Sequence, residues 1–324
     1  MNQDTFQRIV EPEAHRLQTL IEAIDRDEEH TEMAEFPARY RRLCQRLAEA
    51  RYRRYSADLV GRLDALVARG HALLYRERRG DNALRRSALA LLSDFPRALR
   101  AEWRLLAVAS VLFFGPLFSL ALAIHWQPSL VHSVLSPEAV SNIEAMYDPA
   151  SPRFLHERPA SDDMQMFGFY IRNNTGIGLR TFASGALLGL GSALLLLFNG
   201  VMIGAVTGHL LAAGMSSTFL PFVAGHGAFE LPAIVVAGVA GLRLGVAIIA
   251  PGRHSRSESL RRSAHRVLIL VAGFATMFLL AAFLEAFWSS SHTIPGPFRL
   301  GVGALLWAAV LAWLGLGGRS DAPR

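Results

Sequence analysis

His226 and Glu230 lie four residues apart in an otherwise apolar stretch, FVAGHGAFELPAIVVAGVAG. Residues i and i+4 share one face of a helix, so this spacing directs an imidazole and a carboxylate into one site. Such a pair can handle protons or bind a cation, and a charged residue at the centre of a membrane helix costs about 2.5 to 3.5 kcal/mol. Alternatively, the glycines and Pro232 place the pair near an interface, where a solvated or helix-capping role costs little.

Two further ionisable residues, Arg243 and Glu285, fall within predicted membrane spans. Arg243 follows Glu230 by 13 residues, or about 20 Å along one helix at 1.5 Å per residue, so the two cannot pair within it. We expect Arg243 to extend toward the interface or to meet the neighbouring loop. Glu285 lies near the outer end of its span, where either a site role or exposure to headgroups fits.

The composition indicates a protein that is partly embedded in a membrane. Of 324 residues, 52% are hydrophobic, and the mean hydropathy is +0.27. The chain contains no lysine; residues 1–32 carry a net charge of −6 and residues 33–104 a net charge of +9, with histidine counted as neutral. A basic segment beside a membrane attracts anionic lipid or an acidic partner. We expect no nucleic-acid partner, because the arginines already have a topological explanation.

Residues 1–104 are predicted to form a cytoplasmic, arginine-rich helical domain. Apolar residues repeat at helical spacing in two stretches: Leu17, Leu20, Ile21 and Ile24, then Leu59, Leu63, Leu66, Val67 and Leu74. Breaks are expected around residues 25–35, 55–56 and 79–81, which gives three or four helices. The single cysteine, Cys44, excludes an internal disulfide and a cysteine-based zinc site.

Residues 105–318 are predicted to form an all-α, polytopic membrane domain. The first span, 105–126, follows several arginines and ends at Trp126, so the N-terminus is expected in the cytoplasm. Residues 127–180 carry a net charge of −2 and read as an extracytoplasmic loop with a short surface helix at 137–148. The later spans are expected at about 181–198, 200–214, 226–250, 267–288 and 299–317.

The apolar run from residue 181 to residue 214 is too long for one span, and Asn199-Gly200 is the expected break. Its halves could be two short spans or a re-entrant hairpin, so five or six membrane segments fit, and six is preferred. A break exposes backbone groups that could line a transport site.

Successive GxxxG spacings in the same run predict close helix packing and a homo-oligomer, most simply a dimer. The arginine-rich segment 253–266 is expected in the cytoplasm. Both termini are therefore predicted on the cytoplasmic side of a bacterial inner membrane.

Several motifs together resemble the stage II sporulation protein M family, in particular its longer bacterial members with a cytoplasmic helical domain. They include SDFPRALRAEW, FGFYIRNNTGIGLRTFASGALLGLGSALLLLFNGVMIG, GHGAFELPAIVVAGVAG and AAFLEAFWSSS. The residues that match the family are Asn173, Asn174, Asn199, Gly200, His226, Gly227, Glu230 and Glu285.

This resemblance implies a polytopic membrane protein. In spore formers the namesake holds cell-wall hydrolases at the engulfing septum. The longer members occur widely in bacteria that do not sporulate, and their genes often lie beside those of MoxR-type AAA+ ATPases, which makes such an ATPase a candidate partner. The extended N-terminal region departs from the short sporulation protein and argues against a direct role in engulfment.

Three functions remain open from the sequence. The first is a scaffold or regulator that recruits envelope partners; it needs no cofactor, metal or catalytic residues, and no nucleotide-binding loop, placed nucleophile or HExxH motif is present. The second is a transporter or ion pathway that uses His226 and Glu230. The third, and weakest, is an intramembrane metal-dependent hydrolase with His226, Glu230 and Glu285 as ligands.

Overall fold

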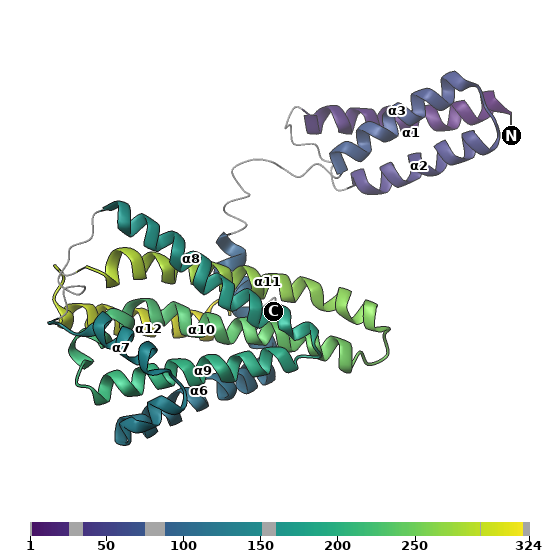
Figure 1. The fold of residues 1–324 in the computed structure, drawn as a ribbon. Coiled ribbons are helices and arrows are strands. Elements are labelled where there is room, and N and C mark those ends of the chain that lie inside the picture. Colours follow the sequence, from purple (N-terminus) through teal and green to yellow (C-terminus); the bar gives the residue numbers. More distant parts are fainter. Residues whose placement is uncertain (1, 26–34, 75–87, 151–159, 292, 320–324) are drawn as a thin grey trace. The chain divides into compact units, whose positions relative to one another are not determined.

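The computed structural model describes residues 2–25, 35–74, 88–150, 160–291 and 293–319 (Figure 1). These residues fold into helices joined by turns, with no strand among them, which confirms the predicted all-α class. The chain divides into two compact units, residues 1–85 and residues 86–324. Each unit has a hydrophobic core of its own.

The first unit is a three-helix bundle of α1 (Gln3–Asp25), α2 (Phe36–Tyr52) and α3 (Ala57–Leu74). Its core contains the apolar stripes expected from the sequence, including Leu17, Leu20, Ile21, Leu59 and Leu63. Pro37 lies in the first turn of α2, where a missing N–H leaves no hydrogen bond unmade. The breaks predicted around residues 25–35 and 79–81 lie mostly outside the described residues.

The second unit begins earlier than the predicted boundary at residue 104. The π-helical turn η2 (Ala90–Asp94) and helix α5 (Phe95–Ala101) pack with the membrane helices. The Phe95 ring lies 5.4 Å from the Trp313 ring between centroids, and Phe95 is fully buried. The apolar face of α5 therefore assigns it to the membrane core, although its arginines are typical of the cytoplasmic region.

Five helices of the described chain are long and apolar enough to cross a membrane. They are α6 (Trp103–Trp126), α9 (Leu190–Ala212), α10 (Ser216–Ile249), α11 (Arg256–Phe283) with its π-helical end η5 (Leu284–Ser289), and α12 (Gly296–Leu316). The central helix is α10, with 67% of its most apolar stretch buried, compared with 17% for α6 and 11% for α12. Apolar side chains on the outer helices are therefore left to contact lipid.

Helix α8 (Ala160–Ala183) corrects the prediction that residues 127–180 form an external loop. It runs antiparallel to α11: Phe167 contacts Phe287 near one end, and Phe182 contacts Phe274 near the other. Four charged residues make α8 too polar to be recognised as a span from the sequence. Of the predicted loop, the 3₁₀ helix η3 (Pro128–Ser133) and the surface helix α7 (Pro137–Tyr147) remain outside the bundle.

The predicted break at Asn199-Gly200 is wrong, because both residues lie inside the continuous helix α9. The chain turns instead between α8 and α9, through the short 3₁₀ helix η4 (Ser184–Ala186). Leu188 and Gly189 have φ angles of +56° and +79°, a left-handed conformation that ends the turn. The single helix α9 thus covers most of both predicted spans, 181–198 and 200–214.

The GxxxG glycines of α9 bring its backbone against α6 within the same chain. A Cβ atom on Gly204 would lie 2.5 Å from the carbonyl oxygen of Leu117, and one on Gly208 would lie 2.5 Å from that of Ala121. Gly200 has a similar contact with Phe113. The glycine at position 200 therefore serves close packing rather than a helix break. The predicted dimer stays a prediction, and this face of α9 no longer supports it.

The membrane unit has two distinct ends, which we name by the helices found there. At the α5 end, Arg100 donates to the carbonyl oxygens of Leu314 and Gly317, so the start of α6 and the end of α12 lie together. At the α7 end, Thr218 donates to the carbonyl oxygen of Tyr147, next to the turn between α9 and α10. The five apolar helices and α8 all run between these ends (Figure 1).

Candidate functional site

His226, Glu230 and Glu285 converge within the half of the membrane unit nearest the α7 end. Their potential ligand atoms all lie within 4.8 Å of one another. His226 Nε2 and the nearer oxygen of Glu230, one helical turn apart on α10, are separated by 4.0 Å. The third residue, Glu285, is supplied by η5 at the end of α11. The i, i+4 spacing seen in the sequence therefore places two members, and the fold adds the third.

Hydrogen bonds from neighbouring side chains orient His226 and Glu285. His226 Nδ1 lies 3.0 Å from the hydroxyl oxygen of Ser289, which follows Glu285 by four residues. On α8, the Asn174 amide donates to a Glu285 oxygen at 3.3 Å, and Asn173 donates to the Asn174 side-chain oxygen at 2.9 Å. The two asparagines that match the family thus orient Glu285 across the interface between α8 and α11.

The surroundings of the cluster are apolar and aromatic. His226 is only 5% exposed, and its ring meets the Phe222 ring edge-on at 5.3 Å. Tyr147 of α7 packs against Phe222 with 5.7 Å between ring centroids. Burial raises the pKa of the Tyr147 phenol above its usual value, and the negative charge of Glu285 raises it further. The phenol therefore stays neutral and available as a hydrogen-bond donor near the cluster.

Neither glutamate in the cluster forms an ion pair with an arginine in the described part of the chain. Arg299 of α12 donates to the backbone oxygen of Ser289, the residue whose side chain contacts His226. Two carboxylates in a low-dielectric site without an arginine partner among the described residues require a proton or a cation for neutrality. The arrangement can therefore hold a proton or a metal ion.

Three residues predicted for the same site lie elsewhere. Asn199 turns its amide back to the carbonyl oxygen of Leu195 in its own helix, and Gly200 packs against α6. Arg243 lies toward the α5 end, with Nε 3.4 Å from a carboxylate oxygen of the buried Glu102. Arg243 thus pairs with Glu102 and not with Glu230, as expected from the distance along α10. Gly227 is adjacent to the cluster and buried.

Sequence reasoning missed two residues that complete the surroundings of the cluster. Ser289 follows Glu285 by four residues, the same spacing that drew attention to His226 and Glu230, so its position carried a usable signal. Tyr147 is brought in by the packing of α7 on α10, through ring contacts with Phe219 and Phe222. No local pattern around Tyr147 indicates that contact.

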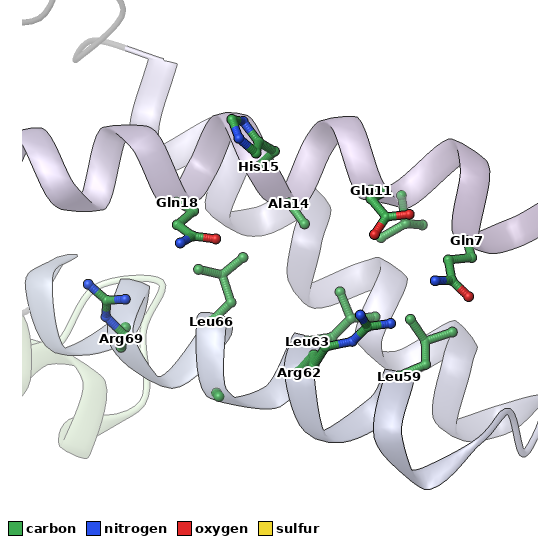
Figure 2. A pocket seen from close by; sticks show the side chains of 12 residues that line it. Gln7, Glu11, Ala14, His15, Gln18, Leu59, Arg62, Leu63, Leu66 and Arg69 are labelled. Carbon is green, nitrogen blue, oxygen red and sulfur yellow. The ribbon is translucent and has the colours of Figure 1, made fainter.

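The N-terminal bundle carries a separate candidate site, a groove of about 400 Å³ between α1 and α3 (Figure 2). Apolar side chains form its floor: Val10, Ala14, Leu59, Leu63 and Leu66. Polar and charged side chains of both helices surround them: Gln7, Glu11, His15, Gln18, Arg62 and Arg69. An apolar channel with a polar rim is the form that accepts the apolar face of a helix.

Comparison with known proteins separates the same two regions. Residues 5–76 match a domain of unknown function (DUF8413), which covers the three-helix bundle. No curated protein and no solved structure shows significant similarity to the chain. Residues 107–290 match Stage II sporulation protein M, and this stretch contains Asn174, His226, Glu230, Glu285 and Ser289. Because the match covers more than half of the chain, this membrane protein belongs to the stage II sporulation protein M family.

Proposed function

We propose that this protein is a scaffold or regulator of the bacterial inner membrane that recruits envelope or cell-wall-remodelling partners. The observation that carries this proposal is the groove between α1 and α3 in a bundle that forms its own compact unit. The membrane unit anchors the chain, and the bundle offers a binding surface on the cytoplasmic side. Anchoring by one unit and partner binding by the other require no catalytic residues. We therefore propose that the protein is not an enzyme.

The groove fits an amphipathic helix of a partner protein. Leu59 and Leu63 are buried beneath it in the bundle core, so a partner helix would contact the half-buried Leu66 and the exposed Ala65 of α3. On the rim, Arg62 and Arg69 outnumber the single carboxylate, Glu11. We therefore expect a partner helix with acidic residues beside its apolar face. A MoxR-type AAA+ ATPase is the first candidate to test, and a second copy of this chain is the alternative.

The interior of α10 favours anchoring over transport. Beyond Glu230, every residue from Pro232 to Gly241 is buried, and none of them carries a polar side chain. Ten helical residues correspond to about 15 Å, half the thickness of a bilayer's hydrocarbon core. The polar cluster near the α7 end thus has no polar continuation along α10 toward the α5 end.

Cation transport remains a second candidate function, because three ionisable groups converge at His226, Glu230 and Glu285. Glu230→Gln keeps the side-chain shape and removes the charge. If the cluster carries protons or cations, this variant abolishes flux into proteoliposomes while the fold and assembly persist. Unchanged flux in the variant would exclude this second function.

The scaffold proposal is tested by paired substitutions in α3. Ala65 and Ala68 are both exposed, but only Ala65 lines the groove. We expect Ala65→Glu to weaken binding of the full-length, detergent-purified protein to a MoxR-type ATPase from the same bacterium by at least about tenfold, or 1.4 kcal/mol. Ala68→Glu should bind as the unmodified protein does. Equal binding by both variants would contradict docking in the groove, and no binding by the unmodified protein would exclude this partner.

A further inference from the structure

We propose that His226, Glu230 and Glu285 bind one divalent transition-metal ion inside the membrane unit, with Zn²⁺ as the ion to test. The proposal concerns the membrane unit alone and does not depend on the groove in the N-terminal bundle. It rests on the geometry of the three side chains, their hydrogen-bonded support and the space beside them.

The distances fit an ion with little adjustment. In a tetrahedral site, two ligands at about 2.0 to 2.2 Å from one Zn²⁺ ion lie about 3.4 Å apart. His226 Nε2 and the nearer Glu230 oxygen are 4.0 Å apart. All three ligand atoms lie within 4.8 Å of one another, so rotations of the two glutamate side chains are enough to close the set. One imidazole and two carboxylates also suit Mn²⁺ and Fe²⁺.

The hydrogen bond behind His226 leaves the correct nitrogen for a metal. When Nδ1–H donates to the Ser289 hydroxyl oxygen at 3.0 Å, Nε2 carries the free lone pair that faces Glu230 and Glu285. Metal-binding histidines are commonly oriented in this way through their other nitrogen. Asn174 provides the equivalent support for Glu285 and is only 2% exposed. The two supporting residues, Ser289 and Asn174, are therefore buried, whereas Glu285 itself is half-buried.

The charge of the site can also be balanced by a cation. Within the described residues, the glutamates have no arginine partner, so a dication would neutralise both carboxylates. The pair of His209 and Glu144 behaves differently: its atoms are in direct contact at 2.8 Å, and no third ligand joins them within the part of the chain that the structure describes. A direct contact of that kind satisfies the pair without a metal. The 4.0 Å gap between His226 and Glu230 leaves room for an ion between them.

Space for the ion and a fourth ligand is present beside Glu230. Gly227 is buried, and yet a Cβ atom placed on it would have no neighbour within 4 Å. On α10, residues 227 and 230 are neighbours at i and i+3. Three protein ligands with one open position describe the type of zinc site that keeps a water molecule as its fourth ligand. The neutral Tyr147 phenol packs near this position and can contact that water.

The proposal is tested by measuring Zn²⁺ bound to the full-length protein in detergent after chelation and removal of the chelator. Elemental analysis after equilibration with micromolar Zn²⁺ is expected to give one ion per chain. Glu230→Gln and Glu285→Gln should each weaken binding by at least about 100-fold, and Asn174→Ala, which changes a positioning residue, by about tenfold to 100-fold. His209→Ala, from the neighbouring His–Glu pair, should bind as the unmodified protein does.

Two further measurements separate metal binding from a general effect on folding. Co²⁺ bound to the unmodified protein should give the visible absorption of a four-coordinate ion, and His226→Ala should lose it. Zn²⁺ should also raise the melting temperature of the unmodified protein but not that of Glu285→Gln. The proposal is overturned if the unmodified protein binds no Zn²⁺ or Co²⁺, or if both glutamine variants retain full binding.

Discussion

The two ends of the membrane unit differ in how the charges of their carboxylates are balanced. Near the α5 end, Glu102 is only 8% exposed and lies 3.4 Å from Arg243 and 3.3 Å from Arg266. Toward the α7 end, Glu230 and Glu285 share a site with one histidine and no arginine partner among the described residues. The first arrangement neutralises itself within the chain. The second is neutral only when a proton or an ion is added.

The first prediction concerns which end faces the cytoplasm, and its expected effect is all or none. In a chain with Cys44→Ser, cysteines are introduced separately at two exposed positions, Glu138 on α7 and Ser257 at the start of α11. In intact spheroplasts, a membrane-impermeant maleimide should label Glu138→Cys and leave Ser257→Cys unlabelled until the membrane is opened. The physical reason is the arginine-rich segment around Ser257, which favours the cytoplasmic side. Labelling of Ser257→Cys in intact spheroplasts would contradict the predicted orientation.

The second prediction compares two glycines of α10 that lie toward opposite ends. A Cβ atom on Gly241 would meet the Ser192 hydroxyl and lie 2.8 Å from the carbonyl oxygen of Phe182, whereas one on Gly227 meets nothing within 4 Å. Gly241→Ala should therefore destabilise the protein by roughly 2 kcal/mol or more, through overpacking. Gly227→Ala should leave stability unchanged or raise it by up to about 1 kcal/mol, because alanine favours the helix. Thermal melting in detergent measures both, and equal losses would contradict the comparison.

The third prediction compares the carboxylates themselves, in metal-free protein. Glu102→Gln removes the negative charge that two arginines share, and should cost about 1 to 2 kcal/mol after allowance for the partial exposure of Arg243 and Arg266. Glu285→Gln removes one of two unpaired carboxylates and should raise the melting temperature slightly. Opposite signs are the expected result of paired melting curves. A loss of stability in Glu285→Gln as large as that in Glu102→Gln would show that the two ends do not differ.

The helices that could be predicted from the sequence are those marked by a pattern of apolar residues within one short stretch. The apolar stripes of residues 17–24 and 59–67 lie in the core of the N-terminal bundle, and the i, i+4 relation of His226 and Glu230 holds on α10. Apolar length also identified α6, α10, α11 and α12 as spans, although their ends differ by up to ten or eleven residues from those expected. In each of these cases a short window of sequence contains the whole physical cause.

The failures concern residues whose role depends on a distant partner. Helix α8 was assigned to a loop because its polar residues suggested water, whereas Asn174 is buried against Glu285, 111 residues away. Gly200 was interpreted as a break because a glycine weakens an isolated helix, whereas here it allows α9 to approach Phe113 of α6. Glu285 was named with His226 and Glu230 from the sequence, but neither its contact with Asn174 nor the contact of Gly200 with α6 can be identified from the local pattern.

The contact between α5 and α12 has a consequence for the order of biosynthesis. Arg97 and Arg100 donate to the carbonyl oxygens of Leu314, Gly317 and Gly318, which are the unpaired acceptors at the end of a helix. During translation, these two arginines emerge before α6, and their acceptors emerge with the end of α12. The helices between them must therefore be synthesised and inserted before these hydrogen bonds can form. The contact between α5 and α12 closes only after α12 has entered the membrane.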